Sequence, residues 1–403
     1  MPPRRRAPTV EAPRLEDYLT YETNSKYTPQ ALYAHMQSVP DLPEALGFPA
    51  GVGPPSLDIN GPALRVTGKS ERIGRDEFIP LILAKLKDPR LPINCVHIWN
   101  QNFLLTRNPP PIRAISSFPN VCALYLCHVE CSEDQFISLI RSYPNLKRLV
   151  LDNISIREYE SGSRAHADPA EAISVSASAI RDGQRGPEIE LISVYVDNIT
   201  GWTLLDLFAS RRSPVALRDL TMLMLPHNTE VICNDTNFVP RLSRLISLCP
   251  RLASLDIDHF NIVSPLAPLD LSPSIRDIQI NVFITGNFET NMVLNWWAST
   301  LNQLTHPRYF SKVTIGVELD VDHIPREAWD NLPTHVPGWA ALDQALIRPQ
   351  LTVYEVKVQV MKYKPTLKGF SRTAMSAWFS TVCLPKTQKT YGTRRYSFSC
   401  SRD

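Results

Sequence analysis

The sequence predicts an α/β protein in which helices and short strands alternate and the strands form a short parallel sheet. Two observations carry this prediction. An apolar phrase with strand spacing recurs along most of the chain, and several copies follow a segment with the spacing of an amphipathic helix. The chain has 403 residues with 35 Pro and only 15 Gly, and part of this proline excess is itself periodic. We therefore expect a repeat protein.

The repeated phrase reads Pro, any residue, apolar, any two residues, apolar, any residue, apolar. Its last two apolar positions are two residues apart, so both side chains lie on one face of a strand. The proline prevents a preceding helix from running on into that strand. Copies with proline begin at Pro119, Pro144, Pro187, Pro250, Pro273 and Pro349, the last with Leu351, Tyr354 and Val356 as its apolar positions, and weaker copies are Ile93/Val96/Ile98, Leu217/Leu220/Met222 and Phe310/Val313/Ile315.

A helix is expected before several of these strands. The best signal is a capping box from Ser132 to Gln135, which leads into an amphipathic stretch ending at Tyr143. Tandem Trp296 and Trp297 point about 100° apart on a helix, so one can lie in the core while the other is partly exposed at a binding surface. We favour core packing. Further segments with helical spacing are 202–208, 239–248, 293–304 and 339–347.

Successive phrases are separated by as few as 23 residues (250 to 273) and as many as 43 (144 to 187). The short spacings match the roughly 20–29 residues of leucine-rich repeats. The long spacings contain polar insertions, of which 158–186 is predicted to be a mobile loop. FPNVCALYLCHV, YPNLKRLVLDNI and CPRLASLDIDHF resemble the repeats of fungal F-box and leucine-rich-repeat proteins of the irregular, ribonuclease-inhibitor-like kind, over about residues 90 to 360.

The resemblance implies a leucine-rich-repeat-like solenoid, or horseshoe, whose sheet captures a protein substrate. Such proteins typically carry an F-box near the N-terminus, which docks on the Skp adaptor of a cullin-RING ubiquitin ligase. The nearest match here is Leu42-Pro43-Glu44-Ala45-Leu46. Glycines and prolines from Gly47 to Pro55 follow it, and each Gly costs a helix about 1 kcal/mol and each Pro about 3. The F-box is therefore absent or degenerate.

The chain divides into three predicted parts. Residues 1–75 form a proline-rich irregular arm, in which Thr28-Pro29 marks the start of one short helix. Residues 76–360 form the solenoid. Residues 361–403 form a basic, aromatic-containing C-terminal tail with nine Lys and Arg against one Asp. The sequence leaves open whether the arm and the tail are ordered.

Charge and cysteine usage limit the class of protein. The net charge of +2 gives no overall basic field. No apolar run approaches the roughly 20 residues that span a bilayer, and the N-terminus is unlike a signal peptide. The eight scattered cysteines indicate buried thiols in a reducing compartment. We expect a soluble cytoplasmic or nuclear protein without a membrane partner.

Polar residues follow four of the strands at a fixed distance, each with an apolar residue after it. We expect them to turn inward and bond backbone groups where the chain bends, because buried amides need partners. They are His128, Asn153, Asn198 and His259.

No common catalytic or phosphate-binding motif is present, so we expect no enzyme activity, cofactor or metal. Cys122, Cys127 and Cys131 have no zinc-ligand spacing and no second cluster. The tetrads Asp256–His259 and Asp320–His323 leave a hydrolase or metal-dependent enzyme as an alternative. We favour a structural interpretation, in which Asp256 and Asp258 face solvent.

The sequence thus favours a non-enzymatic protein-interaction scaffold, with the ubiquitin-ligase adaptor role implied by the resemblance alone. A nucleic-acid-associated protein that uses the basic tail is an alternative of a different class. The candidate partner-binding residues are non-core positions at the strands, namely Lys147, Arg148, Val150, Arg251, Ser254, Asp256, Asp277 and Gln279.

Overall fold

The computed structural model describes residues 12–21, 26–48, 62–66, 77–104, 111–157, 186–194, 199–225, 232–233, 238–257, 261–262, 266–284, 289–319, 337–363 and 372–402. The chain forms two compact units. Unit 1 contains residues 1–150 and 154–187, and unit 2 contains residues 151–153 and 188–403. The three residues 151–153 are the middle of one continuous strand, Arg148–Ile156, which we describe with its neighbouring strand in unit 1.

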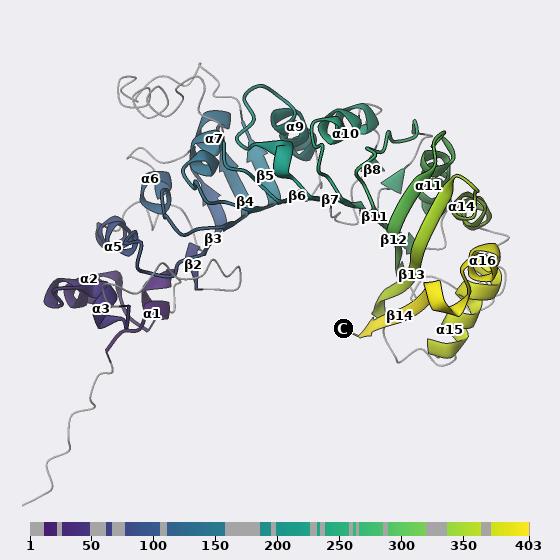
Figure 1. Cartoon of the computed structure of the whole chain (residues 1–403). Helices are drawn as coiled ribbons and strands as arrows, with labels where there is room; N and C mark the ends of the chain where they lie inside the picture. Colours follow the sequence, from purple (N-terminus) through teal and green to yellow (C-terminus); the bar gives the residue numbers. More distant parts are fainter. Residues whose placement is uncertain are drawn as a thin grey trace, which may run out of the picture. The chain divides into compact units, whose positions relative to one another are not determined.

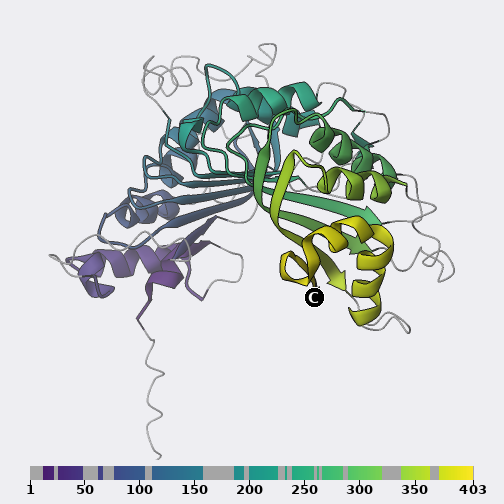
Figure 2. The same cartoon turned by 45° about the vertical axis from the view of Figure 1, so that its right-hand side comes forward.

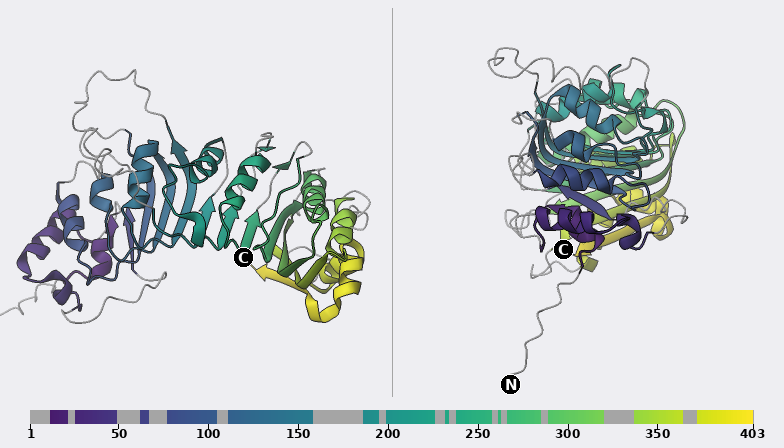
Figure 3. Two further views of the ribbon diagram at one scale, coloured as in Figure 1. Left: turned by 45° about the horizontal axis from the view of Figure 1, so that its top comes forward. Right: turned by 90° about the vertical axis from the view of Figure 1, so that its left-hand side faces the viewer.

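The strands of unit 1 lie in the order of the sequence, and the first four pair in parallel. They are β1 Thr20–Tyr21, β2 Ala63–Val66, β3 Cys95–Asn102, β4 Ala123–Cys131 and β5 Arg148–Ile156. The helices are α1 Leu15–Leu19, α2 Pro29–Ser38, α3 Leu42–Ala45, α5 Phe78–Leu86, α6 Pro111–Ile115 and α7 Glu133–Arg141. Helices α5, α6 and α7 lie on one face of the strands (Figures 1 and 3).

Unit 2 repeats this plan with a parallel sheet whose strands also follow sequence order. These strands are β6 Leu191–Val194, β7 Met222–Leu225, β9 Ser254–Ile257, β11 Asp277–Ile284, β12 Arg308–Leu319, β13 Leu351–Tyr363 and β14 Tyr396–Arg402, with a separate pair of β8 Ile232–Cys233 and β10 Asn261–Ile262. The helices are α9 Ile199–Phe208, α10 Phe238–Ser247, α11 Glu289–Asn302, α14 Gly338–Leu346, α15 Arg372–Trp378 and α16 Pro385–Arg395, with a 3-10 turn at Leu217–Asp219 and a π-helical turn at Phe379–Cys383. Figure 2 shows these helices beside the sheet.

The predicted alternation of helix and parallel strand is confirmed, and the apolar phrase forms the core. In β4, Leu124 and Leu126 are buried and stand in register with Val96 and Ile98 of β3. A hydrogen-bond pattern recurs where strands begin: one carbonyl accepts from two successive amides of the next repeat, as Cys122 does from Lys147 and Arg148. The carbonyls of Asn94, Glu190, Thr221, Ala253 and Arg276 do the same.

The predicted helix starts are confirmed where their capping residues are local. The Ser132 side chain accepts from the amide of Gln135, whose side chain accepts from the amide of Ser132. Thr28 caps α2 by accepting from Ala31. The four other helical segments appear as α9, α10, α11 and α14.

Two copies of the phrase were placed in the wrong register. In β7 the buried strand positions are Leu223 and Leu225, because the 3-10 turn at Leu217–Asp219 shifts the phrase by three residues. In β13 the core positions are Val356 and Val358, preceded by Val353, whereas Tyr354 is 60% exposed. A short apolar run fits the phrase in more than one register, and pairing with the neighbouring strand determines which register is adopted.

Trp296 and Trp297 are both buried, which confirms the favoured core packing. The indole nitrogen of Trp296 donates to the carbonyl of Ala267 at 2.8 Å. The chain before β11 therefore covers the side of α11 that the isolated helix would expose.

The predicted arm contributes structure to unit 1, since β1 and β2 belong to its sheet. The F-box candidate forms only the four-residue α3, and the chain leaves it at Gly47 with φ +91°. Arg90 joins this helix to the repeats through ion pairs to Asp41 at 2.7 Å and to Asp88 at 2.8 Å. Asp41 also caps α3 by accepting from the amide of Glu44.

This ion pair predicts acid sensitivity of the α3 attachment. Hydrogen bonds from Arg90 lower the pKa of Asp41 and of Asp88. Lowered carboxyl pKa values stabilise the folded state above about pH 4, and this contribution is lost as the pH falls through the lowered values. We expect hydrogen exchange of the α3 amides, corrected for the intrinsic pH dependence, to accelerate below pH 4. Arg90→Gln should accelerate it already at pH 7, whereas Arg113→Gln, at an exposed position of α6, should leave it unchanged.

The C-terminal segment 361–403 contains more than a tail. Its strand β14 pairs with β13, so the sheet continues beyond the predicted boundary at residue 360. Asp343 of α14 attaches α16 by accepting from the amides of Lys386 at 3.0 Å and Thr387 at 2.8 Å. The insertion 158–185 lies outside the described residues.

Among the described residues, no helix combines the length and the apolar character needed to cross a membrane.

Candidate functional site

An aromatic patch lies on the face of the unit 1 sheet opposite α5, α6 and α7. The rings of His97 and Tyr125 stack in register across β3 and β4, with centroids 4.5 Å apart and planes 28° apart. Two residues further along β3, Trp99 is 50% exposed, and its ring lies 6.4 Å from that of His128. We call these four residues the aromatic patch. Half-exposed tryptophan is enriched at binding surfaces, so this is the first candidate for partner contact.

The stacked His97 is held neutral. Burial lowers its pKa, and the nearby Arg65 guanidinium lowers it further. An unprotonated imidazole can pack its flat face on Tyr125 without bringing a charge into the patch. The patch therefore offers aromatic surface at neutral pH.

A row of left-handed residues crosses the three strands beside this patch. Asn100, His128 and Asn153 have φ of 53°, 51° and 50°. At each of these residues, successive core positions of the strand are three residues apart and not two. In β4, for example, buried Leu126 is followed by buried Val129. Asn and His adopt this conformation more readily than most residues.

This row corrects the prediction for the polar residues after the strands. His128 is exposed, so it does not turn inward, and Asn153 is half-exposed. The left-handed backbone conformation, which His and Asn tolerate, explains why these residue types occupy positions 128 and 153. Asn198 and His259 lie outside the described residues, and Asn100 of the same row was missed by the sequence pattern.

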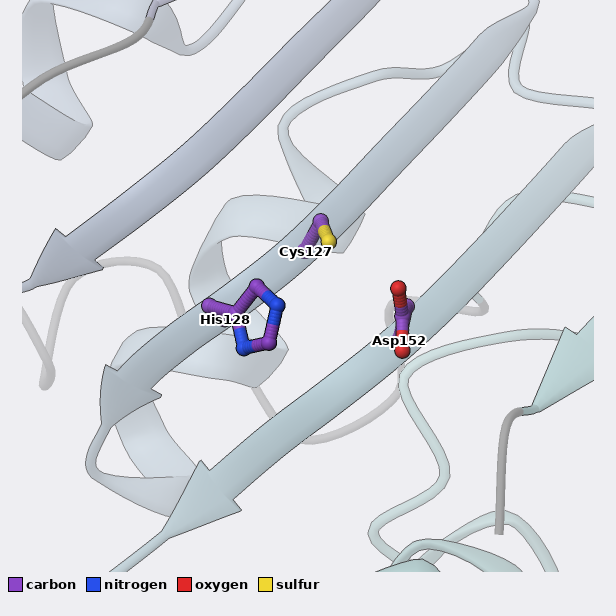
Figure 4. A group of neighbouring side chains, drawn as sticks. All are labelled: Cys127, His128 and Asp152. Carbon is purple, nitrogen blue, oxygen red and sulfur yellow. The ribbon is translucent and has the colours of Figure 1, made fainter. Parts of the chain in front are cut away.

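The left-handed residue also gathers metal-ligating side chains. Cys127 and His128 both lie between the core positions Leu126 and Val129, so neither side chain enters the core, and Asp152 stands beside them on β5 (Figure 4). Their ligand atoms all lie within 4.8 Å of one another. Spacing of cysteines alone did not reveal this cluster, because its third member comes from the next repeat.

The other cysteines of unit 1 are poor ligands. Cys95, Cys122 and Cys131 are buried, whereas Cys127 is half-exposed. Burial raises the pKa of Cys95 to about 12, with a further contribution from Cys122, and burial likewise raises the pKa of Cys131 to about 12. A thiol must lose its proton to bind a metal. Among the described thiols of this unit, Cys127 is the one open to solvent chemistry.

The predicted partner-binding residues are divided between the two units. Lys147, Arg148 and Val150 belong to unit 1, and the other five belong to unit 2. Lys147 and Arg251 precede their strands. Arg251 is exposed and forms an ion pair with Asp219 at 2.6 Å. Six of the eight are half-exposed, namely Lys147, Arg148, Val150, Ser254, Asp277 and Gln279.

The predicted solvent-facing position of Asp256 is wrong. Its side chain is 8% exposed and accepts a hydrogen bond from Asn281 at 2.8 Å, across β9 and β11. Asp277, also half-exposed, has its pKa raised by burial, against the opposing effect of Lys312. Side chains of a neighbouring strand thus bury positions that the alternation of apolar and polar residues predicts to be exposed. The remaining residues of the two Asp-x-Asp-His tetrads, apart from Ile257, lie outside the described residues.

The basic C-terminal segment divides into packed aromatics and exposed cations. Phe379 packs against Trp378, with centroids 4.6 Å apart, and against Phe398 at 5.9 Å. Arg394 and Arg395 are exposed, and the guanidinium of Arg395 lies 5.5 Å from the ring centre of the exposed Tyr354. Trp378 and Phe398, two of the aromatics that suggested nucleic-acid stacking, are therefore half-exposed and pack on the buried Phe379.

No known protein-family model matches this chain, and a search of the curated proteins finds no similar sequence.

Proposed function

We propose that this protein is a non-enzymatic protein-interaction module built as a leucine-rich-repeat-like solenoid. The single observation that supports this most is the aromatic patch, where half-exposed Trp99 lies beside the stacked His97 and Tyr125 on a sheet face. Aromatic side chains presented on a rigid sheet lose little conformational freedom on binding, so they suit a partner site. A role as substrate adaptor of a cullin-RING ubiquitin ligase extends this proposal by resemblance.

The experiment is an affinity purification with matched variants. We expect Trp99→Ala to weaken partner binding at least tenfold, because truncation of a central Trp typically costs 2 kcal/mol or more. Leu81→Ala is the control, since Leu81 is 46% exposed but lies on α5. Isothermal titration with the purified partner measures both variants, and circular dichroism checks their folding.

Equal losses in Trp99→Ala and Leu81→Ala would contradict the aromatic patch as the binding surface. Recovery of no stable partner would contradict the interaction module itself. A Skp-type adaptor and a cullin among the recovered proteins would support the ligase role, and their absence from a complex that contains another partner would count against it.

A second candidate function is nucleic-acid binding through the C-terminal segment, favoured by Arg395 placed over exposed Tyr354. Deleting residues 361–403 is a poor test because β14 is part of the sheet. Replacing both Arg394 and Arg395 by Gln keeps the strand. Salt-dependent retention of nucleic acid that this double variant loses would favour the second function.

A further inference from the structure

We propose that Cys127, His128 and Asp152 form a binding site for a divalent transition-metal ion of the zinc class. The site would use three protein ligands and leave a fourth position for water or a partner side chain. It shares His128 with the aromatic patch but does not depend on the interaction function.

The first step of the argument is backbone geometry. Successive residues of a regular strand point to opposite faces, so a Cys-His pair on such a strand would be divided between core and solvent. Here His128 adopts φ 51°, and the two residues share the gap between buried Leu126 and Val129. The left-handed residue therefore lets one strand supply two adjacent ligands.

The second step is register. Asn100 on β3 and Asn153 on β5 are left-handed residues at the equivalent places. The pairing of β3 with β4 therefore continues past His128, with Trp99 opposite Cys127 and Gln101 opposite Val129. Asp152 immediately precedes Asn153, as Cys127 precedes His128. The same feature repeated in two strands thus brings the carboxylate beside the thiol and the imidazole.

The third step is chemistry and access. Two ligand atoms of one tetrahedral zinc ion, at about 2.0–2.3 Å from it, lie roughly 3.3–3.8 Å apart. The separations within 4.8 Å seen here can close to that range by rotation of side chains, because His128 is exposed and the other two are half-exposed. A thiolate with an imidazole selects zinc, cobalt or copper over calcium and magnesium, which prefer oxygen.

The test uses the purified full-length protein, stripped with a chelator and titrated with Co²⁺ under reducing conditions. We expect a thiolate-to-cobalt charge-transfer absorption that saturates at one equivalent and disappears when Zn²⁺ is added. Cys127→Ser should abolish this band. His128→Asn and Asp152→Asn should each weaken Zn²⁺ binding at least tenfold in competition with a chromophoric chelator.

The controls keep the result decisive. His128→Asn introduces the residue found at the same left-handed position on both neighbouring strands, so it should fold even if Cys127→Ser does not. Cys400→Ser removes the half-exposed cysteine of β14 and should leave the band unchanged. Absence of the band from the wild-type protein, or its full retention in Cys127→Ser, would overturn the site. Zn²⁺ affinity of His128→Asn and Asp152→Asn equal to that of the wild type would do so as well.

Discussion

Asp343→Ala is expected to destabilise the attachment of α16 by about 3–6 kcal/mol, because two hydrogen bonds to a charged group, each contributing about 1.5–3 kcal/mol, are lost together. Asp343 is 2% exposed and accepts from the amides of Lys386 and Thr387. These are first-turn amides of α16, which have no partner within their own helix. The helix itself starts without a side-chain cap of its own, since Leu384 occupies that position.

Hydrogen exchange of the α16 amides measures this effect, because it reports the local free energy of opening. Asp343→Asn should fall between wild type and Asp343→Ala, since one amide oxygen remains to accept. Asp270→Ala removes an exposed carboxylate of the same unit and should leave the exchange unchanged. Protection in Asp343→Ala equal to that of the wild type would show that α16 is held by other contacts.

Gly338→Ala is expected to reduce stability by about 1–3 kcal/mol through overpacking between α11 and α14. A methyl group added at Gly338 would lie 2.7 Å from Cβ of Leu294 and 2.8 Å from the backbone oxygen of Asn291. Both contacts are with parts of α11 that cannot rotate away. The amide of Gly338 also donates to Oδ1 of Asn291 at 2.6 Å, so separating the helices would stretch this bond as well.

Chemical denaturation and exchange of the α14 amides should both register the Gly338→Ala change. Ala340→Ser is the matched control, because it adds one atom at an exposed position of the same helix. If Gly338→Ala and Ala340→Ser were equally stable, the close approach of the two helices would have no energetic consequence.

Local chemistry explains which parts of the fold could be predicted. Ser132 and Gln135 cap α7 with groups three residues apart, and the proline phrases end one element and begin the next within a few residues. The buried pairs Leu124/Leu126 of β4 and Leu149/Leu151 of β5 follow from a period of two. These signals act over less than ten residues, so neighbouring sequence contains all of the information.

Register and burial required partners from other repeats. Tyr354 and Val353 are equally acceptable as apolar positions in the sequence, and only pairing of β13 with β12 shows that Val353 is buried and Tyr354 exposed. Asp256 is covered because Asn281 reaches it from β11. Side-chain alternation assigns a face to a residue but does not reveal what covers that face.

By itself, the sequence determined an α/β chain of alternating helices and parallel strands, the places where most helices begin, and the lack of common catalytic motifs. Only the tertiary structure decided that His128 turns beside Cys127 and that Asp152, 25 positions after Cys127 in the sequence, stands next to both. The physical reason is that hydrophobic periodicity and capping are properties of one segment, whereas a site assembled across two strands depends on their register and on a left-handed residue in each.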